Sequence, residues 1–138
     1  MFVLDASLTI AWLVREEAAP EADAVLDMLV EQPATVPELW HLEVANVLLM
    51  AMRRKRISPD VLDILLRRLQ MLPIETVHMV RDFRMNDILA LARREGLTVY
   101  DATYLHLALQ LGLPLATLDG DLRAAAERNG VQVLPAQT

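Results

Sequence analysis

Two acidic residues directly follow short apolar segments that are typical of buried strands. Asp5 comes after Phe2–Leu4, and Asp119 comes after Leu115–Leu118. Ligands of α/β proteins bind beyond the carboxyl ends of parallel strands, so both carboxylates are expected at the same edge of a sheet. Carboxylates that meet at such an edge can share a divalent cation.

Two further acids, Glu43 and Asp101, interrupt apolar helical patterns. On a helix, Glu43 shares a face with residues at spacings of three and four, namely Leu39, Asn46, Val47 and Met50. Its carboxylate is therefore expected to point inward, where an ionised acid is costly unless it is paired or bound to a cation. No Lys or Arg follows Glu43 until Arg53. Asp101 likewise lies where its pattern favours an apolar residue.

Four acids at such places indicate a metal site, because crowded carboxylates repel and a divalent cation relieves the repulsion. Ligands that are all oxygen select hard ions, here Mg²⁺ or Mn²⁺. The chain has no cysteine, and its three histidines share no ligand spacing, so zinc is not expected. Such ions can activate water, stabilise a pentacovalent phosphate and assist the leaving oxygen, so phosphodiester hydrolysis needs no nucleophilic side chain.

Each acid also has a structural interpretation. Asp5 and Asp101 could each cap the helix that follows, and Asp119 could belong to a turn with Gly120. Asp121 is expected to cap the next helix, which leaves Asp119 as the closer candidate ligand. For Glu43 the structural interpretation is weakest, since no cationic partner is evident.

Predicted strands and helices alternate along the chain, and they must position these acids. Apolar runs predict strands at 2–4, 34–36, 73–77, 115–118 and 131–133. Helical periodicity and its stop signals predict helices at 6–14, 21–31, 38–56, 59–72, 81–95, 101–111 and 121–128. This alternation, with few hairpin signals, implies a mainly parallel sheet covered by helices. Without a linker or repeat, one α/β domain is expected over residues 1–138.

Composition limits the kind of partner. A net charge of −6 argues against general coating of nucleic acid, but not against an enzyme that meets phosphate through metal ions. The basic run Arg53–Arg56 is either a solvated helix end or a contact for an RNA backbone. A mean hydropathy of +0.30 predicts that some apolar surface meets a partner protein. With no signal-like or membrane-spanning segment, a cytoplasmic location is expected.

Four ordered motifs resemble those of PIN-domain nucleases. They are Val3-Leu4-Asp5-Ala6-Ser7, Glu43-Val44-Ala45-Asn46, the segment 100–108 around Asp101, and the segment 115–122 around Asp119. Each is weak alone, but their order and spacing match along the whole chain. The resemblance implies a three-layer α/β/α fold and Mg²⁺- or Mn²⁺-dependent cleavage of RNA.

The resemblance also assigns residue roles and partners. It implies that the metal ions are held by Asp5, Glu43, Asp101 and Asp119. It implies support through hydrogen bonds or bound water from Ser7, Asn46, Thr117 and Asp121. The chain length is typical of VapC toxins, which implies a homodimer and a small antitoxin protein that blocks the site.

Other classes fit less well. A response-regulator receiver needs a lysine after a late strand, and the only lysine is Lys55, within a predicted helix. A phosphatase of the haloacid dehalogenase kind needs a second Asp two residues after the first, and this position is Ser7. A PIN-type nuclease outside a toxin pair and an inactive PIN-like binding module stay open as alternatives. Inactive modules usually lose acids, whereas this chain keeps all four.

Overall fold

The centre of the molecule is a five-stranded, all-parallel sheet. In this computed structural model, residues 1–14, 20–78 and 84–136 are described. The strands lie in the order β3-β2-β1-β4-β5. Their bounds are β1 Phe2–Leu4, β2 Ala34–Pro37, β3 Ile74–Val77, β4 Leu115–Ala116 and β5 Val133–Leu134. The predicted parallel sheet is therefore confirmed.

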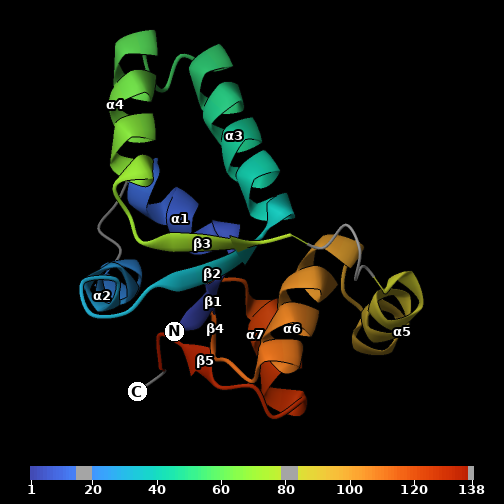
Figure 1. Cartoon of the computed structure of the whole chain (residues 1–138). Coiled ribbons are helices and arrows are strands. Elements are labelled where there is room, and N and C mark those ends of the chain that lie inside the picture. Colours follow the sequence, from blue (N-terminus) through green and yellow to red (C-terminus); the bar gives the residue numbers. More distant parts are fainter. Residues whose placement is uncertain (15–19, 79–83, 137–138) are drawn as a thin grey trace.

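Helices cover both faces of the sheet (Figure 1). One layer holds α1 Ala6–Leu13, α2 Pro20–Met28, α3 Glu38–Arg53 and α4 Pro59–Gln70. The other holds α5 Met85–Glu95, α6 Val99–Leu111 and α7 Gly120–Arg128. Within the layers α1 packs on α2 and α3, and α6 packs on α5 and α7. This is the three-layer α/β/α arrangement that the sequence predicts.

The central strands are completely buried, which explains their uninterrupted apolar sequences. Phe2, Val3 and Leu4 are 0% exposed, and Val3 is in register with Thr35 on one side and Leu115 on the other. Helix α3 is anchored to α1 through the indole of Trp40, whose Nε1 donates to Thr9 Oγ1 at 3.0 Å. Strand β1 and the start of α3 are thus held rigidly within the core.

The strand order defines where a ligand should bind. The chain moves outward from β1 to β2 and β3, and then returns to β4 on the opposite side of β1. Direction therefore reverses between β1 and β4, and the crevice beyond the carboxyl ends of these strands is the preferred binding position in open α/β sheets. Asp5 lies there, with its backbone N–H donating to the Ala116 carbonyl at 2.9 Å.

Several element boundaries differ from the prediction. Strand β4 ends at Ala116 instead of Leu118. The N–H groups of Leu118 and Asp119 donate to the hydroxyls of Ser7 and Thr117 and not to a neighbouring strand. Helix α3 ends at Arg53, followed by Lys55 at a φ of 60°. Helix α6 begins at Val99, two residues early. The predicted helix at 81–95 begins at Met85 within the described residues, and positions 81–83 lie outside them.

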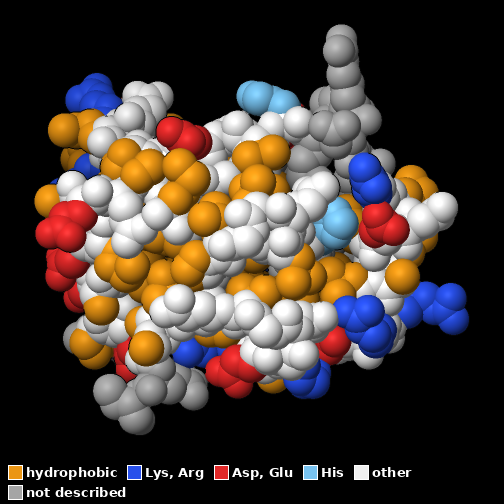
Figure 2. All heavy atoms as spheres, turned by 60° about the horizontal axis from the view of Figure 1, so that its bottom comes forward, with side chains coloured by type: hydrophobic (Ala, Val, Ile, Leu, Met, Phe, Trp, Pro, Cys, Tyr) orange, Lys and Arg blue, Asp and Glu red, His pale blue; other side chains and the backbone are white. Residues whose placement is uncertain are grey.

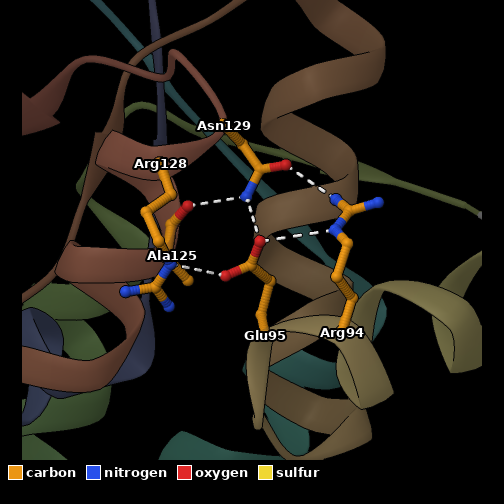
Figure 3. Close-up of polar contacts among 5 residues, drawn as sticks. All are labelled: Arg94, Glu95, Ala125, Arg128 and Asn129. Carbon is orange, nitrogen blue, oxygen red and sulfur yellow. Dashed lines mark hydrogen bonds and ion pairs between the residues drawn. The ribbon is translucent and has the colours of Figure 1, made fainter.

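A polar cluster joins the carboxyl ends of α5 and α7 (Figure 3). Arg128 Nε donates to Glu95 Oε2 at 2.8 Å, and Asn129 Nδ2 donates to Glu95 Oε1 at 2.9 Å. Arg94 Nη2 donates to Asn129 Oδ1 at 2.7 Å. The Arg128 hydrogen bond, followed by that of Asn129, lowers the pKa of Glu95 below its usual value of 4.5.

This lowered pKa gives a prediction for stability against pH. The ionised Glu95 stabilises the fold above its unfolded-state pKa, and this contribution is lost as the pH falls through the folded-state pKa. Glu95→Gln should therefore lower the melting temperature at pH 7, with a difference that shrinks at pH 3. The exposed acid Glu127 on α7 offers a control, since Glu127→Gln should leave the melting temperature nearly unchanged. An equal loss for Glu95→Gln at both pH values would contradict the electrostatic role.

Candidate metal centre

The Asp5 carboxylate is held by two hydroxyl groups from separate segments. Asp5 is 4% exposed, and its Oδ2 accepts hydrogen bonds from Ser7 Oγ at 2.8 Å and Thr117 Oγ1 at 2.7 Å. Although Asp5 occupies the N-cap position of α1, its side chain makes no capping hydrogen bond. The structure therefore does not support the capping interpretation of Asp5.

Thr117 connects the ends of β1 and β4. Its side chain is 0% exposed, and Oγ1 also accepts from the Asp119 N–H at 3.0 Å. Ser7 Oγ lies 3.3 Å from this hydroxyl and accepts from the Leu118 N–H at 3.1 Å. Ser7 and Thr117, two of the predicted supporting residues, thus touch both Asp5 and the backbone that carries Asp119.

Glu43 reaches the same region from α3 and meets Tyr104 of α6. The Tyr104 hydroxyl donates to Glu43 Oε1 at 2.7 Å, and the tyrosine is 0% exposed. Glu43 is half-buried beside the buried stripe of α3, which consists of Trp40, Val44, Leu48 and Ala51. The carboxylate is therefore turned inward as predicted, but its partner is a neutral hydroxyl. Tyr104 was missed, and the available signal was its place three residues after Asp101.

Asp101 lies in the first turn of α6 and does not cap it. The cap is Thr98, whose Oγ1 accepts from the Asp101 N–H at 3.1 Å. The capping interpretation of Asp101 is therefore wrong, because the helix begins two residues before the predicted start. The half-buried Asp101 carboxylate stays available at the helix N-terminus, where the positive end of the helix dipole favours a negative charge.

The cap of α7 is Asp119, whereas the sequence predicts Asp121. Asp119 is the N-cap of α7, with Oδ1 accepting from the Leu122 N–H at 2.9 Å. Asp121 is exposed in the first turn and is not the cap. The early end of β4 explains the error, since it allows α7 to begin at Gly120. Asn46 is exposed on α3 and lines a hollow between α1 and α3.

Repulsion between their charges links the four acids electrostatically. Burial raises the pKa of Asp5, against the hydrogen bonds of Thr117 and Ser7, and repulsion from Asp119 adds to the increase. Burial also raises the pKa of Glu43, helped by repulsion from Asp5 and Asp101. The pKa of Asp101 is raised to about 6 by burial, followed by repulsion from Asp5 and Asp119. In the metal-free protein the ionised forms of Asp5, Glu43 and Asp101 are therefore disfavoured, and a bound cation would relieve the repulsion.

The donor set suits a hard divalent cation. All four candidate ligands are carboxylates, and Mg²⁺ and Mn²⁺ prefer oxygen. Two histidines are engaged elsewhere, with His41 Nε2 2.8 Å from Thr76 Oγ1 and His78 3.7 Å from Glu38. Among the described residues, no three acidic or histidine side chains are already close enough together to hold one ion. In this arrangement an ion would be held directly by one or two carboxylates and by water at its other positions, which is usual for Mg²⁺.

A buried arginine, which the sequence analysis did not single out, fixes the end of β4. Arg123 on α7 is 9% exposed and donates from Nη1 to the Thr117 carbonyl at 2.9 Å. Its Nη2 donates to the Pro135 carbonyl at 2.7 Å, so the guanidinium ties the segments that follow β4 and β5. In the sequence, the only indication for Arg123 was that it follows the apolar Leu122 in a short predicted helix. Arg123 helps to position Thr117 and, through Thr117, the Asp5 carboxylate.

The fold is that of a known class. The family model described as PIN domain matches residues 2–128, and the chain belongs to the PIN-domain family. A curated relative, ribonuclease VapC3 of Pyrobaculum aerophilum, is 34% identical over 134 residues, which are 96% of this chain and 98% of the relative.

Two solved structures show the same fold. A crystal structure of PAE2754 from Pyrobaculum aerophilum superposes with a TM-score of 0.70 at 24% identity, covering 96% of this chain and 82% of the other. A crystal structure of FitAcB from Neisseria gonorrhoeae gives a TM-score of 0.65 at 19% identity, covering 97% and 96%. At these identities the likeness supports the architecture, and the chemistry has to be argued from the site.

Proposed function

We propose that this protein is a Mg²⁺- or Mn²⁺-dependent endoribonuclease whose metal ligands are Asp5, Glu43, Asp101 and Asp119. The observation that carries the proposal is the convergence of four mutually repelling carboxylates at the switch point of a PIN fold. A bound ion would activate water for attack on the phosphodiester and stabilise the charge that develops.

The surrounding residues orient these ligands. Ser7 and Thr117 fix one oxygen of Asp5, and Tyr104 fixes one oxygen of Glu43. A carboxylate held in this way loses less conformational freedom when it binds an ion, and outer-shell partners of this kind typically contribute 10- to 100-fold in metal affinity or activity. Asn46 and Asp121 are exposed and would act through bound water or substrate.

A chelation experiment tests the metal mechanism. The purified protein should cut single-stranded RNA in Mg²⁺ or Mn²⁺, stop when EDTA is added, and recover when excess metal is restored. The reason is that no thiol or clustered histidine offers another route to the attacking nucleophile. Cleavage that continues undiminished in EDTA would overturn the metal mechanism.

We also propose that the enzyme is the toxin of a VapBC-like pair, acting in the cytoplasm, inhibited by a small antitoxin. The supports are the family resemblance, the relative named as a ribonuclease, and exposed apolar surface. Figure 2 shows one face on which hydrophobic side chains spread across the surface, with most Lys and Arg toward its margin. A groove of about 300 Å³ between α3 and α4, lined by Trp40, Val44 and Leu69 among others, offers further apolar surface. No helix among the described residues could cross a membrane.

We expect the chain to self-associate through the same exposed apolar surface. Val30 is 87% exposed, Met71 83% and Leu42 72%, and an interface that covered such side chains would remove them from water. Light scattering at micromolar concentration should give a mass of twice the 15.5 kDa of one chain. A mass of one chain throughout that range would count against the homodimer.

A further inference from the structure

A hollow of about 420 Å³ lies between α1 and α3, and its lining includes Asn46, one of the predicted supporting residues. Its lining is mixed, and the apolar part includes Ile10 and Val14 of the α1 side and Val47 and Met50 of α3. The polar part consists of Asn46 on α3 and of Arg54 and Arg56 beyond the C-terminus of that helix. The proposed chemistry at the carboxylates makes no use of this hollow.

One stripe of α3 connects the hollow to the carboxylates. Glu43, Val47, Met50 and Arg54 follow one another at spacings of three or four residues, which places them along one face of the helix. Arg54 comes 54 − 43 = 11 residues after Glu43, so the stripe runs roughly 16 Å at about 1.5 Å per residue. The face that presents Glu43 to the metal centre therefore continues along the hollow to a cation.

The charges along this stripe suit an extended polyanion. Four consecutive basic residues, Arg53–Arg56, stand at the far end of α3 in a chain whose net charge is −6. The helix dipole favours cations at this end of α3, both at Arg53 in the last turn and at Arg54 at the C-cap. The Arg54 side chain also lines the hollow, so its charge is available there. Single-stranded nucleic acid is recognised through cations that track the backbone and surfaces that receive the bases.

We propose that this hollow is the path of the RNA strand, with Arg54 binding a phosphate a few nucleotides from the cleaved bond and the apolar part of the lining receiving a base. This inference rests on the proposed ribonuclease function and adds a binding surface to it. One phosphate lies at the carboxylates, and the strand then follows α3 toward the basic end. Arg54 contributes to affinity and register, whereas cleavage depends on the acids.

The test measures binding separately from cleavage. Asp5→Asn protein, which should bind without cutting, is titrated against a fluorescently labelled single-stranded RNA at several salt concentrations in Mg²⁺. Adding Arg54→Ala should weaken binding severalfold and reduce the slope of log K against log salt by about 0.7, the value for one phosphate contact on a single strand. Arg67→Ala on α4 is the matched control: the residue is exposed and removes the same charge, and affinity and slope should stay unchanged.

The outcomes separate this inference from the proposed function. If Arg54→Ala changes RNA binding as expected while the wild-type protein cuts no RNA, the hollow is supported as an RNA-binding path. The ribonuclease proposal then fails. If wild-type protein cuts RNA and Arg54→Ala binds normally, the path is wrong. Equal weakening by Arg54→Ala and Arg67→Ala indicates general electrostatic attraction and also overturns it. A changed oligomeric mass with unchanged RNA affinity would assign the hollow to a protein contact instead.

Discussion

Asp5→Asn should abolish RNA cleavage while leaving the fold intact. Asn has nearly the same shape, and its amide oxygen can still accept from Ser7 and Thr117. It removes the negative charge that a cation needs, so we expect a loss of more than about 100-fold, since even outer-shell partners contribute 10- to 100-fold. The measurements are cleavage rate, Mn²⁺ affinity by calorimetry, and melting temperature. A variant that cuts RNA at the wild-type rate would return Asp5 to a purely structural role.

Thr117 offers a matched pair of controls for this result. Thr117→Val keeps the shape but removes the hydroxyl that donates to Asp5, whereas Thr117→Ser keeps the hydroxyl. The valine variant should lose about 10- to 100-fold in metal affinity, and the serine variant should keep most of it. An effect of equal size in both variants would point to packing at this fully buried position instead of support of the carboxylate.

The arrangement of the sheet was predictable because it depends on patterns that many residues share. Apolar runs such as Phe2–Leu4 are buried on both faces of a parallel sheet, and an acid directly after such a run falls at the carboxyl edge. Asp5 could therefore be placed beside the end of β4 without knowledge of any contact. Glu43 was predicted to turn inward for a similar reason, since helical periodicity determines which face is covered.

The details of the site depend on single long-range contacts, and these are not encoded in a local pattern. Strand β4 ends early because the N–H groups of Leu118 and Asp119 donate to side-chain hydroxyls. The Thr117 carbonyl in turn accepts from the Arg123 guanidinium. That shift makes Asp119 the cap of α7 and leaves Asp121 exposed. Tyr104 was missed for the same reason, since its partner Glu43 is 61 residues away. Sequence periodicity identified the participants, and tertiary contacts determined their roles.

Asp101→Asn should make the metal-free protein more stable at neutral pH, the opposite of the usual effect of a substitution at a half-buried position. The folded-state pKa of about 6 lies above the ordinary value of 3.8, so the folded protein holds this proton more tightly than the unfolded chain. Ionisation therefore costs stability as the pH rises from about 4 to 6, and the cost persists above that. Because Asp101 is only half-buried, solvent screening reduces it to about 1 kcal/mol.

The free energies of unfolding of wild-type and Asp101→Asn protein are measured in urea. Their order should reverse between EDTA and Mn²⁺. In EDTA the two should match at pH 4, and the variant should be more stable by about 1 kcal/mol at pH 7.5. The Thr98 cap accepts from the Asp101 backbone and is untouched by the change. Adding Mn²⁺ at pH 7.5 should stabilise the wild type more than the variant, by up to about 2.7 kcal/mol at a hundredfold excess over Kd. If the variant is instead the less stable protein in EDTA at pH 7.5, the Asp101 charge supports the fold, and its assignment as a metal ligand loses its electrostatic basis.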